Sequence, residues 1–180
     1  GYGGGPPGYG GPPQPGYGPP PPGYGAPQGA PYGGAQYGGG APPFSQPPQP
    51  ARPFFIVSNL NGLVLDIAGG NSSPGAEVIT WHKKGGQEAN QLWYLDNENC
   101  IRSRLNNFLL DASHGDLCVN PDNPACCNRQ KWMFQGEKII NKYDPAQCLD
   151  IKGEDSQPGA KICAWGYKGS RNQHWRRQDV

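Results

Sequence analysis

The sequence predicts an all-β fold: a closed barrel of three similar units, each of about 40 residues, preceded by a disordered arm. Two observations predict the barrel. A Gln-x-Trp triplet occurs three times, ending at Trp93, Trp132 and Trp175. A Leu-Asp pair precedes each triplet, and in every copy an isoleucine lies ten residues before the aspartate. Features that keep their order and spacing through three copies indicate an internal repeat.

The arm is separated from the rest of the chain by its composition. Residues 1–50 hold 17 of the 29 Gly, 16 of the 22 Pro and 6 of the 9 Tyr, but no charged residue. Gly is costly to order and Pro cannot donate a hydrogen bond, so neither helix nor sheet is expected there. We assign residues 1–53 to a disordered arm. Its Tyr rings offer repeated stacking contacts that favour self-association, and a solubilising spacer is the alternative.

Short runs of β-branched and aromatic residues, separated by turn signals, define the strands. In the first unit, residues 54–58 precede Asn61-Gly62, a hairpin signal, and residues 63–67 follow it. The other two units repeat this order, with strands expected at residues 100–103, 108–110, 138–141 and 148–151. Residues 78–81 and 161–165 predict a third strand, and the Gln-x-Trp segments predict a fourth. The domain, residues 54–180, therefore divides into units at about 54–98, 99–137 and 138–180.

Several functional classes are disfavoured by the composition. No apolar run reaches the length of about 18 residues that a membrane span requires. The net charge of +1 provides no basic footprint for nucleic acid. The three His lack metal-ligand spacing, and no nucleophile or metalloprotease motif occurs. We expect no metal, no cofactor and no catalytic residue, and thus a protein that is not an enzyme.

Cysteine usage bears on the compartment. Cys148 and Cys163 fall on neighbouring expected strands and are candidates for a disulfide. In contrast, the adjacent Cys126-Cys127 pair and the absence of a visible signal peptide favour a reducing compartment. We expect a cytoplasmic protein or one exported without a signal peptide.

A Gln-x-Trp triplet in each of three units, with Leu-Asp upstream, resembles the ricin-B-type (R-type) lectin β-trefoil. The resemblance covers residues 54 to about 178. It implies a non-enzymatic carbohydrate-binding module whose partners are glycans or glycoproteins. It also implies that Trp93, Trp132 and Trp175 belong to the barrel core rather than to a sugar site.

In R-type lectins an Asp after the second strand, an aromatic residue and an Asn before the Gln-x-Trp triplet form the sugar site. Acceptors and donors for hydroxyls, beside an aromatic face for the sugar C–H patch, suit such a site. Two units carry this set at identical Asp-to-Trp spacing, so the resemblance implies two sugar sites: Asp66, Trp81, Asn90 and Gln91 in the first unit, and Asp150, Trp165, Asn172 and Gln173 in the third. The alternative use of each Asp is to cap a turn.

The second unit departs from the pattern. No aromatic residue lies between Asp111 and Trp132, and Arg129 replaces the Asn, so we expect its site to be lost or changed. Many galactose-binding members also carry a Gln two residues before the aromatic, where this chain has Ile79 and Cys163. Those departures favour a ligand other than galactose. They also motivate a second hypothesis, a protein-interaction scaffold that has lost sugar binding.

Overall fold

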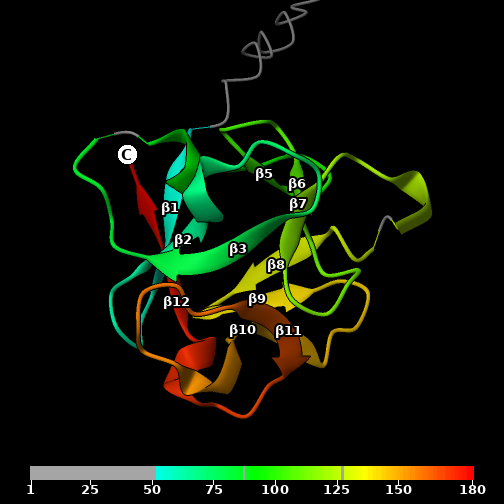
Figure 1. Ribbon diagram of the computed structural model, residues 1–180. Coiled ribbons are helices and arrows are strands. Elements are labelled where there is room, and N and C mark those ends of the chain that lie inside the picture. The colour runs from blue at the N-terminus through cyan, green and yellow to red at the C-terminus, as the bar shows by residue number, and fades with distance from the viewer. Residues whose placement is uncertain (1–51, 87, 127) are drawn as a thin grey trace, which may run out of the picture. The chain divides into compact units, whose positions relative to one another are not determined.

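The computed structural model describes residues 52–86, 88–126 and 128–180, so residues 1–51 of the predicted arm lie outside the described part of the chain. Within the described residues the fold contains strands and single-turn 3-10 helices (Figure 1). The first unit holds β1 (Phe54–Ser58), β2 (Val64–Ile67), β3 (Ala76–Trp81) and β4 (Trp93–Leu95). The second holds β5 (Ile101–Ser103), β6 (Leu109–Asp111), β7 (Cys118–Asn120) and β8 (Trp132–Gln135). The third holds β9 (Lys138–Asn141), β10 (Gln147–Ile151), β11 (Ile162–Gly166) and β12 (Trp175–Asp179).

The first and last strands of the units close a barrel. Antiparallel pairs join β12 to β1, β1 to β4, β4 to β5, and β8 to β9. An antiparallel bridge between Cys100, directly before β5, and Lys131, directly before β8, joins the β5–β8 seam. The Trp175 amide donates to the Glu137 carbonyl at 2.7 Å and closes the β12–β9 seam. The remaining hairpins are β2–β3, β6–β7 and β10–β11. They join one another through the β3–β7 pair and through the bridges Ile79–Lys161 and Asp116–Cys163, and the fold is an all-β β-trefoil.

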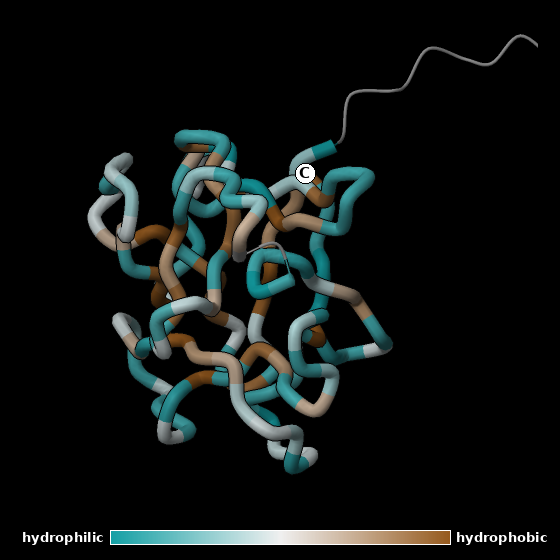
Figure 2. The backbone as a smooth tube through the Cα atoms, turned by 90° about the vertical axis from the view of Figure 1, so that its right-hand side faces the viewer, coloured by the Kyte–Doolittle hydropathy of each residue, from teal (hydrophilic) through white to brown (hydrophobic). Residues whose placement is uncertain are grey.

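The three Gln-x-Trp tryptophans occupy equivalent places in the core, as the sequence predicts. Each is buried to 2% exposure or less. Each indole Nε1 donates to the carbonyl of the Leu in its own Leu-Asp pair, over 3.2 Å to Leu65, 2.9 Å to Leu110 and 2.9 Å to Leu149. In each unit the Gln-x-Trp triplet is therefore hydrogen-bonded to the Leu-Asp pair. Hydrophobic segments run through the interior of the domain, and the outer loops are mostly hydrophilic (Figure 2).

Several strand boundaries differ from the prediction by one or two residues, and the third strand of the second unit, β7, was not predicted. The start of the fourth strand also differs. The fourth strand begins at the Trp of the triplet, whereas the Gln ends a 3-10 turn in the first and third units, at η2 (Ala89–Gln91) and η5 (Arg171–Gln173). The 3-10 turn directs the Gln side chain into the protein. Gln91 and Gln173 are both fully buried there and hydrogen-bonded.

The candidate disulfide between Cys148 and Cys163 is not formed, and both residues are free thiols. They lie diagonally across β10 and β11, with Cys148 opposite Trp165 and Cys163 opposite Asp150. Cys100 and Cys118 are also free and buried. Burial raises the pKa of each of these four thiols to about 11.

The four buried thiols should resist modification in the native state, because the thiolate is the reactive form. In a variant with Cys126→Ser and Cys127→Ser, we expect a chromogenic disulfide reagent at pH 8 to titrate them only after unfolding. Rapid release of the chromophore under native conditions would contradict their burial.

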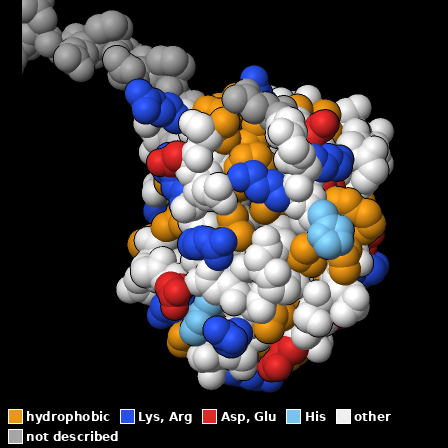
Figure 3. All heavy atoms as spheres, turned by 90° about the vertical axis from the view of Figure 1, so that its left-hand side faces the viewer, with side chains coloured by type: hydrophobic (Ala, Val, Ile, Leu, Met, Phe, Trp, Pro, Cys, Tyr) orange, Lys and Arg blue, Asp and Glu red, His pale blue; other side chains and the backbone are white. Residues whose placement is uncertain are grey.

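On the face shown in Figure 3, Lys and Arg side chains are spread among Asp, Glu and apolar groups and form no continuous basic surface. Across the described residues, no helix is long and apolar enough to cross a membrane.

Candidate functional site

The third unit holds a hollow of about 580 Å³ that brings its predicted site residues together. Asp150 comes from β10, Trp165 from β11, and Asn172 and Gln173 from η5, and all four line the hollow. Gly115 and Asp116 of the second unit complete its wall. The β10–β11 hairpin pairs Asp150 with Cys163 and places Trp165 two residues further along β11, so these side chains lie on the same face of the hairpin.

Gln173 fixes the Asp150 carboxylate. Its Nε2 donates to Asp150 Oδ2 at 2.8 Å and to the Gly166 carbonyl at 2.9 Å. Its Oε1 accepts from the Lys168 backbone amide at 2.7 Å. The nitrogen and the oxygen of the Gln173 amide therefore both bind protein groups. Gln173 thus positions the Asp150 carboxylate and the loop after Trp165.

Asn172 has one end of its amide unused. Its Nδ2 donates to the Ile151 carbonyl at 3.0 Å. Its Oδ1 has no hydrogen-bond partner among the described residues, although Asn172 is only 4% exposed. A buried acceptor without a partner is costly. Asn172 is one of the residues that line the hollow.

The first unit repeats this network. Asn90 donates to Asp66 Oδ1 at 3.0 Å, and Gln91 donates to Asp66 Oδ2 at 2.8 Å. Gln91 also donates to the His82 carbonyl at 2.8 Å and accepts from the Lys84 amide at 3.0 Å, as Gln173 does in its own unit. One difference is that Lys84 Nζ lies 3.5 Å from Asn90 Oδ1, the atom that is unpartnered in the third unit.

Both candidate platform rings are accessible. Trp81 is 39% exposed and Trp165 is 54% exposed, although both belong to strands. Trp81 lies beside the third unit, since a Cβ placed on Gly159 would be 3.8 Å from its Cζ3. The two rings share one strand register, because Trp81 lies opposite Val64 and Trp165 opposite Cys148, two residues before the respective Asp.

The three repeated aspartates differ electrostatically. Burial raises the pKa of Asp66 and of Asp150, and hydrogen bonds from the neighbouring Gln and Asn only partly oppose it. Burial also acts to raise the pKa of Asp111, but hydrogen bonds from Ser113, Asn120 and Gln130 outweigh it and leave the pKa lowered. Only Asp111 accepts from a backbone amide two residues on, Ser113 N at 2.7 Å, so it alone has the turn-capping contact.

The second unit has an asparagine in place of the exposed tryptophan. The register of β6 and β7 places Asn120 where the other units have tryptophan, and Asn120 Nδ2 donates to Asp111 Oδ2 at 3.1 Å. Gln130 donates to the same oxygen at 3.0 Å. The Arg129 guanidinium, at the position of the missing Asn, instead lies 3.9 Å from the centre of the Tyr143 ring.

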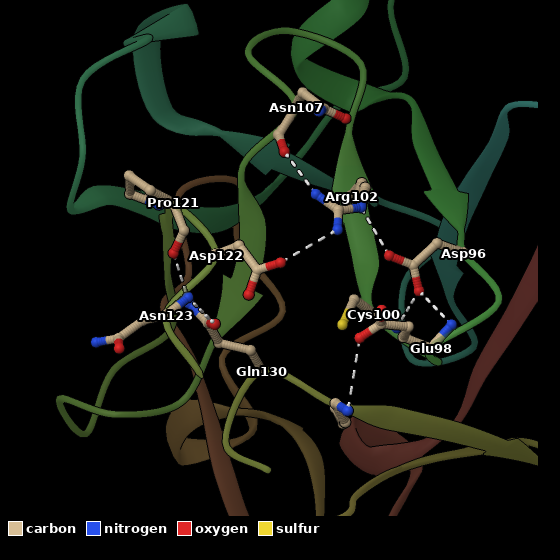
Figure 4. Close-up of polar contacts among 10 residues, drawn as sticks. Asp96, Glu98, Cys100, Arg102, Asn107, Pro121, Asp122, Asn123 and Gln130 are labelled. Atoms are coloured by element: carbon tan, nitrogen blue, oxygen red, sulfur yellow. Dashed lines mark hydrogen bonds and ion pairs between the residues drawn. The ribbon is translucent and has the colours of Figure 1, made fainter. Parts of the chain in front are cut away.

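The loop between β7 and β8 differs in sequence from the loops of the other units and contacts β5. Arg102 lies between Asp96, at 2.7 Å, and Asp122, at 3.6 Å, as Figure 4 shows. Gln130 donates to the Pro121 carbonyl at 3.0 Å (Figure 4). Asp122 and the Pro121 carbonyl of this loop therefore bind partners inside the protein.

Sequence reasoning missed three residues at these sites. Lys84 and Lys168 each follow the exposed tryptophan by three positions and share the backbone contact to Gln. That shared spacing was a signal that could have identified them. Asn120 could not be placed from spacing alone, because the second unit has fewer residues between its Asp and its Gln-x-Trp triplet.

Known proteins share this architecture. Residues 52–175 match the ricin-type β-trefoil lectin domain family. The C-half of an earthworm R-type lectin, solved with GalNAc, is 42% identical, with a TM-score of 0.68, over 72% of this chain and 99% of that one. A mutant of the earthworm lectin C-terminal domain, solved with 6'-sialyllactose, is 39% identical, with a TM-score of 0.66, over 72% of this chain and 99% of that one.

Part of the chain is similar in sequence to a bacterial toxin. The cytolysin of Vibrio vulnificus (strain CMCP6) is 35% identical over 92 residues, which are 46% of this chain and 18% of the cytolysin. The match thus spans less than a fifth of the toxin's length. No catalytic domain is identified in the matched region of this chain, residues 52–175. With its family match over that region, the chain belongs to the ricin-type β-trefoil lectins and is an R-type carbohydrate-binding module.

Proposed function

We propose that the domain binds glycans at two sites, one in the first unit and one in the third, and carries out no covalent chemistry on them. The observation that carries this proposal is the hollow of the third unit, where Asn172 Oδ1 is buried without a partner beside Asp150 and the exposed Trp165. The first unit holds the same residue types in the same register.

Each site residue has a distinct role in this proposal. The Asp66 and Asp150 carboxylates accept hydrogen bonds from two sugar hydroxyls, and the side-chain oxygens of Asn90 and Asn172 accept from a third. Trp81 and Trp165 cover the C–H face of the sugar ring. Gln91 and Gln173 touch no sugar, because their amides are spent on the protein, and they hold the carboxylates in place.

The sugars bound in related structures narrow the choice of candidate ligands. The earthworm lectin structures contain GalNAc and 6'-sialyllactose. A Vibrio vulnificus β-trefoil lectin, 25% identical with a TM-score of 0.61 over 73% of this chain and 96% of that one, contains N-acetyl-D-lactosamine. These three sugars are the first probes. Ile79 and Cys163 cannot replace the hydrogen bonds of the Gln common in galactose binders, so plain galactose should bind more weakly than the substituted sugars.

A glycan array tests the proposal. The full chain, presented in multivalent form, should bind one or more glycan classes, and a Trp81→Ala, Trp165→Ala double variant should lose the signal. An array that stays blank for the wild type would refute sugar binding. It would favour the scaffold hypothesis if protein partners were also captured and were not displaced by free sugar.

The arm raises avidity in this proposal. Two sites on one domain and self-association through the six Tyr of residues 1–50 both increase the effective concentration of binding sites. Deleting residues 1–50 should lower the sedimentation coefficient at high concentration by more than the loss of mass requires. A monomer before and after deletion would exclude this role.

Sugar binding should weaken on acidification before the fold is lost. Because the raised pKa values of Asp66 and Asp150 exceed the ordinary Asp value of 3.8, these carboxyls gain a proton first as the pH falls, and each then loses an acceptor that the sugar needs. The folded form holds these protons more tightly than the unfolded form does. Protonation at these two groups therefore favours folding, and their contribution to stability is lost as the pH rises through the raised values.

Asp111 behaves in the opposite way. Its pKa is lowered, so its stabilising contribution is present above the ordinary Asp value and is lost only as the pH falls through the lowered one. Binding measured on a sugar surface and folding measured by circular dichroism, over the same pH series, should show binding lost at the higher pH. Coincident loss of both would contradict the assignment of Asp66 and Asp150 as binding groups.

A further inference from the structure

The third site has a glutamate where the first site has a glycine. In each unit a 3-10 turn begins directly after the strand that carries the site aspartate, η1 (Ala68–Gly70) in the first unit and η4 (Lys152–Glu154) in the third. The two turns share their backbone conformation, and φ at their last residues is +65° at Gly70 and +56° at Glu154. Glu154 therefore occupies the place of Gly70.

The backbone conformation of Glu154 is one that favours glycine. A φ of +56° lies in the left-handed region, which Gly adopts without steric cost and a residue with a side chain adopts rarely. Glu154 is exposed and forms no ion pair among the described residues, so no such contact offsets this strain. It lines the hollow together with Trp165. Strain of this kind is typical of functional positions.

Glu154 gives the lining of the hollow an excess of negative charge. The charged residues that line it are Asp116, Asp150, Glu154, Lys152 and Lys168. Asp116 lies 2.7 Å from Lys152 Nζ, so these two charges largely cancel. Lys168 is then the single cation of the lining against two carboxylates. Burial raises the pKa of Asp150, and repulsion from Glu154 adds to the rise. A cation bound in the hollow would relieve that repulsion.

The charges near the first site differ. Burial raises the pKa of Asp66 too, but the charged group that acts on it is Lys84, a cation that opposes the rise. Glu88, just before η2, is directed at its own loop, since a Cβ placed on Gly86 would lie 3.6 Å from its Oε1. The chain therefore contains its own comparison, one site with an additional carboxylate and one without it.

We propose that Glu154 is a specificity-determining residue of the third site, and that this site prefers a glycan carrying a free, protonated amine, an amino sugar, over a neutral one. This inference rests on the proposed function. The amine donates hydrogen bonds to the Glu154 carboxylate while the sugar ring covers Trp165. The first site, with Gly70 in this place, lacks that acceptor. Pairs of exposed charges contribute little, so the amine should strengthen binding by about twofold to fivefold at low salt.

The test follows the indole Nε1–H signals of Trp81 and Trp165 in the 15N-labelled full chain at about pH 6.5, where a sugar amine is largely protonated. The probes are galactosamine, with its amine at C2, and 6-amino-6-deoxygalactose, with its amine at C6; galactose is the neutral reference. Each is titrated at about 20 mM and about 500 mM salt. The Trp165 signal should reach its midpoint at about twofold to fivefold lower concentration with at least one amino sugar than with galactose, and high salt should reduce this advantage. The Trp81 signal should show no such advantage.

Matched variants test Glu154 itself. Glu154→Gln removes the charge at nearly constant size and should abolish the advantage at Trp165. Glu154→Gly should do the same without lowering the thermal midpoint, because Gly adopts this φ freely. Glu98→Gln makes the same change of charge at an exposed position of the second unit and should leave the advantage in place. Gly70→Glu, at a position where a Cβ meets nothing within 4 Å, should create an advantage at Trp81.

The outcomes separate this inference from the proposed function. Equal ratios of amino-sugar to galactose affinity at Trp81 and Trp165 would overturn the inference and leave the proposed function intact. A ratio at Trp165 that Glu154→Gln leaves unchanged would do so too. No response at either ring to these sugars, GalNAc, N-acetyllactosamine or 6'-sialyllactose would overturn both.

Discussion

Trp165→Ala is expected to weaken sugar binding at the third unit by about tenfold to a hundredfold while leaving the domain folded. The ring is 54% exposed in the free protein, and in the proposed complex the sugar covers it. Removing it forfeits apolar contact of roughly 1.5–3 kcal/mol, which corresponds to that range of affinity. Isothermal titration of the full chain, with Trp81→Ala as background so that only the third site remains, measures the loss.

The matched control for this prediction is Tyr143→Ala, which removes an exposed aromatic ring of the same unit, 56% exposed, from outside the hollow. It should leave the affinity unchanged. Trp165→Phe should restore part of the binding, because it keeps an aromatic face. Equal affinities for Trp165→Ala and the wild type would remove the ring from the site.

Trp132→Ala is expected to destabilise the domain by about 3–5 kcal/mol, because it leaves a large cavity at the centre of the barrel. The ring is fully buried, and its indole donates to the Leu110 carbonyl at 2.9 Å, so the substitution also removes the partner of a buried acceptor. A domain of marginal stability would lose most of its folded population.

Denaturant unfolding followed by circular dichroism measures this effect. Trp165→Ala serves as the reference, since an exposed ring should change the free energy of unfolding by less than about 1 kcal/mol. Similar stabilities for the two variants would contradict the division of the tryptophans into core and surface. The same division predicts large losses for Trp93→Ala and Trp175→Ala, which occupy the equivalent places.

The sequence was sufficient to predict the fold because the barrel is built from contacts that repeat. Every Gln-x-Trp indole donates to the carbonyl of its own Leu-Asp pair, so two short motifs at constant spacing carry one structural interaction three times. The resemblance to R-type lectins separated core tryptophans from site tryptophans. Trp81 and Trp165 lack the triplet and follow an Asp by fifteen residues, and both are exposed.

Other features of the sites depend on information that spacing does not carry. Asn120 takes the place of a tryptophan through strand register, which the altered length of the second unit conceals. Lys84 and Lys168 share one sequence position, yet one faces Asn90 and the other lies over Trp165. Side-chain direction in such cases is set by neighbours in other segments. Cys148 and Cys163 lie on paired strands but are not opposite each other, and this offset could not be predicted from their positions in the sequence.

Of the five tryptophans, two are proposed sugar platforms and three belong to the core. The most direct measurement of this division is an NMR titration of all five indole Nε1–H signals with 6'-sialyllactose and N-acetyllactosamine. We predict that the signals of Trp81 and Trp165 move progressively and saturate, while those of Trp93, Trp132 and Trp175 stay in place. Saturating shifts at the three buried rings, with Trp81 and Trp165 unmoved, would contradict it.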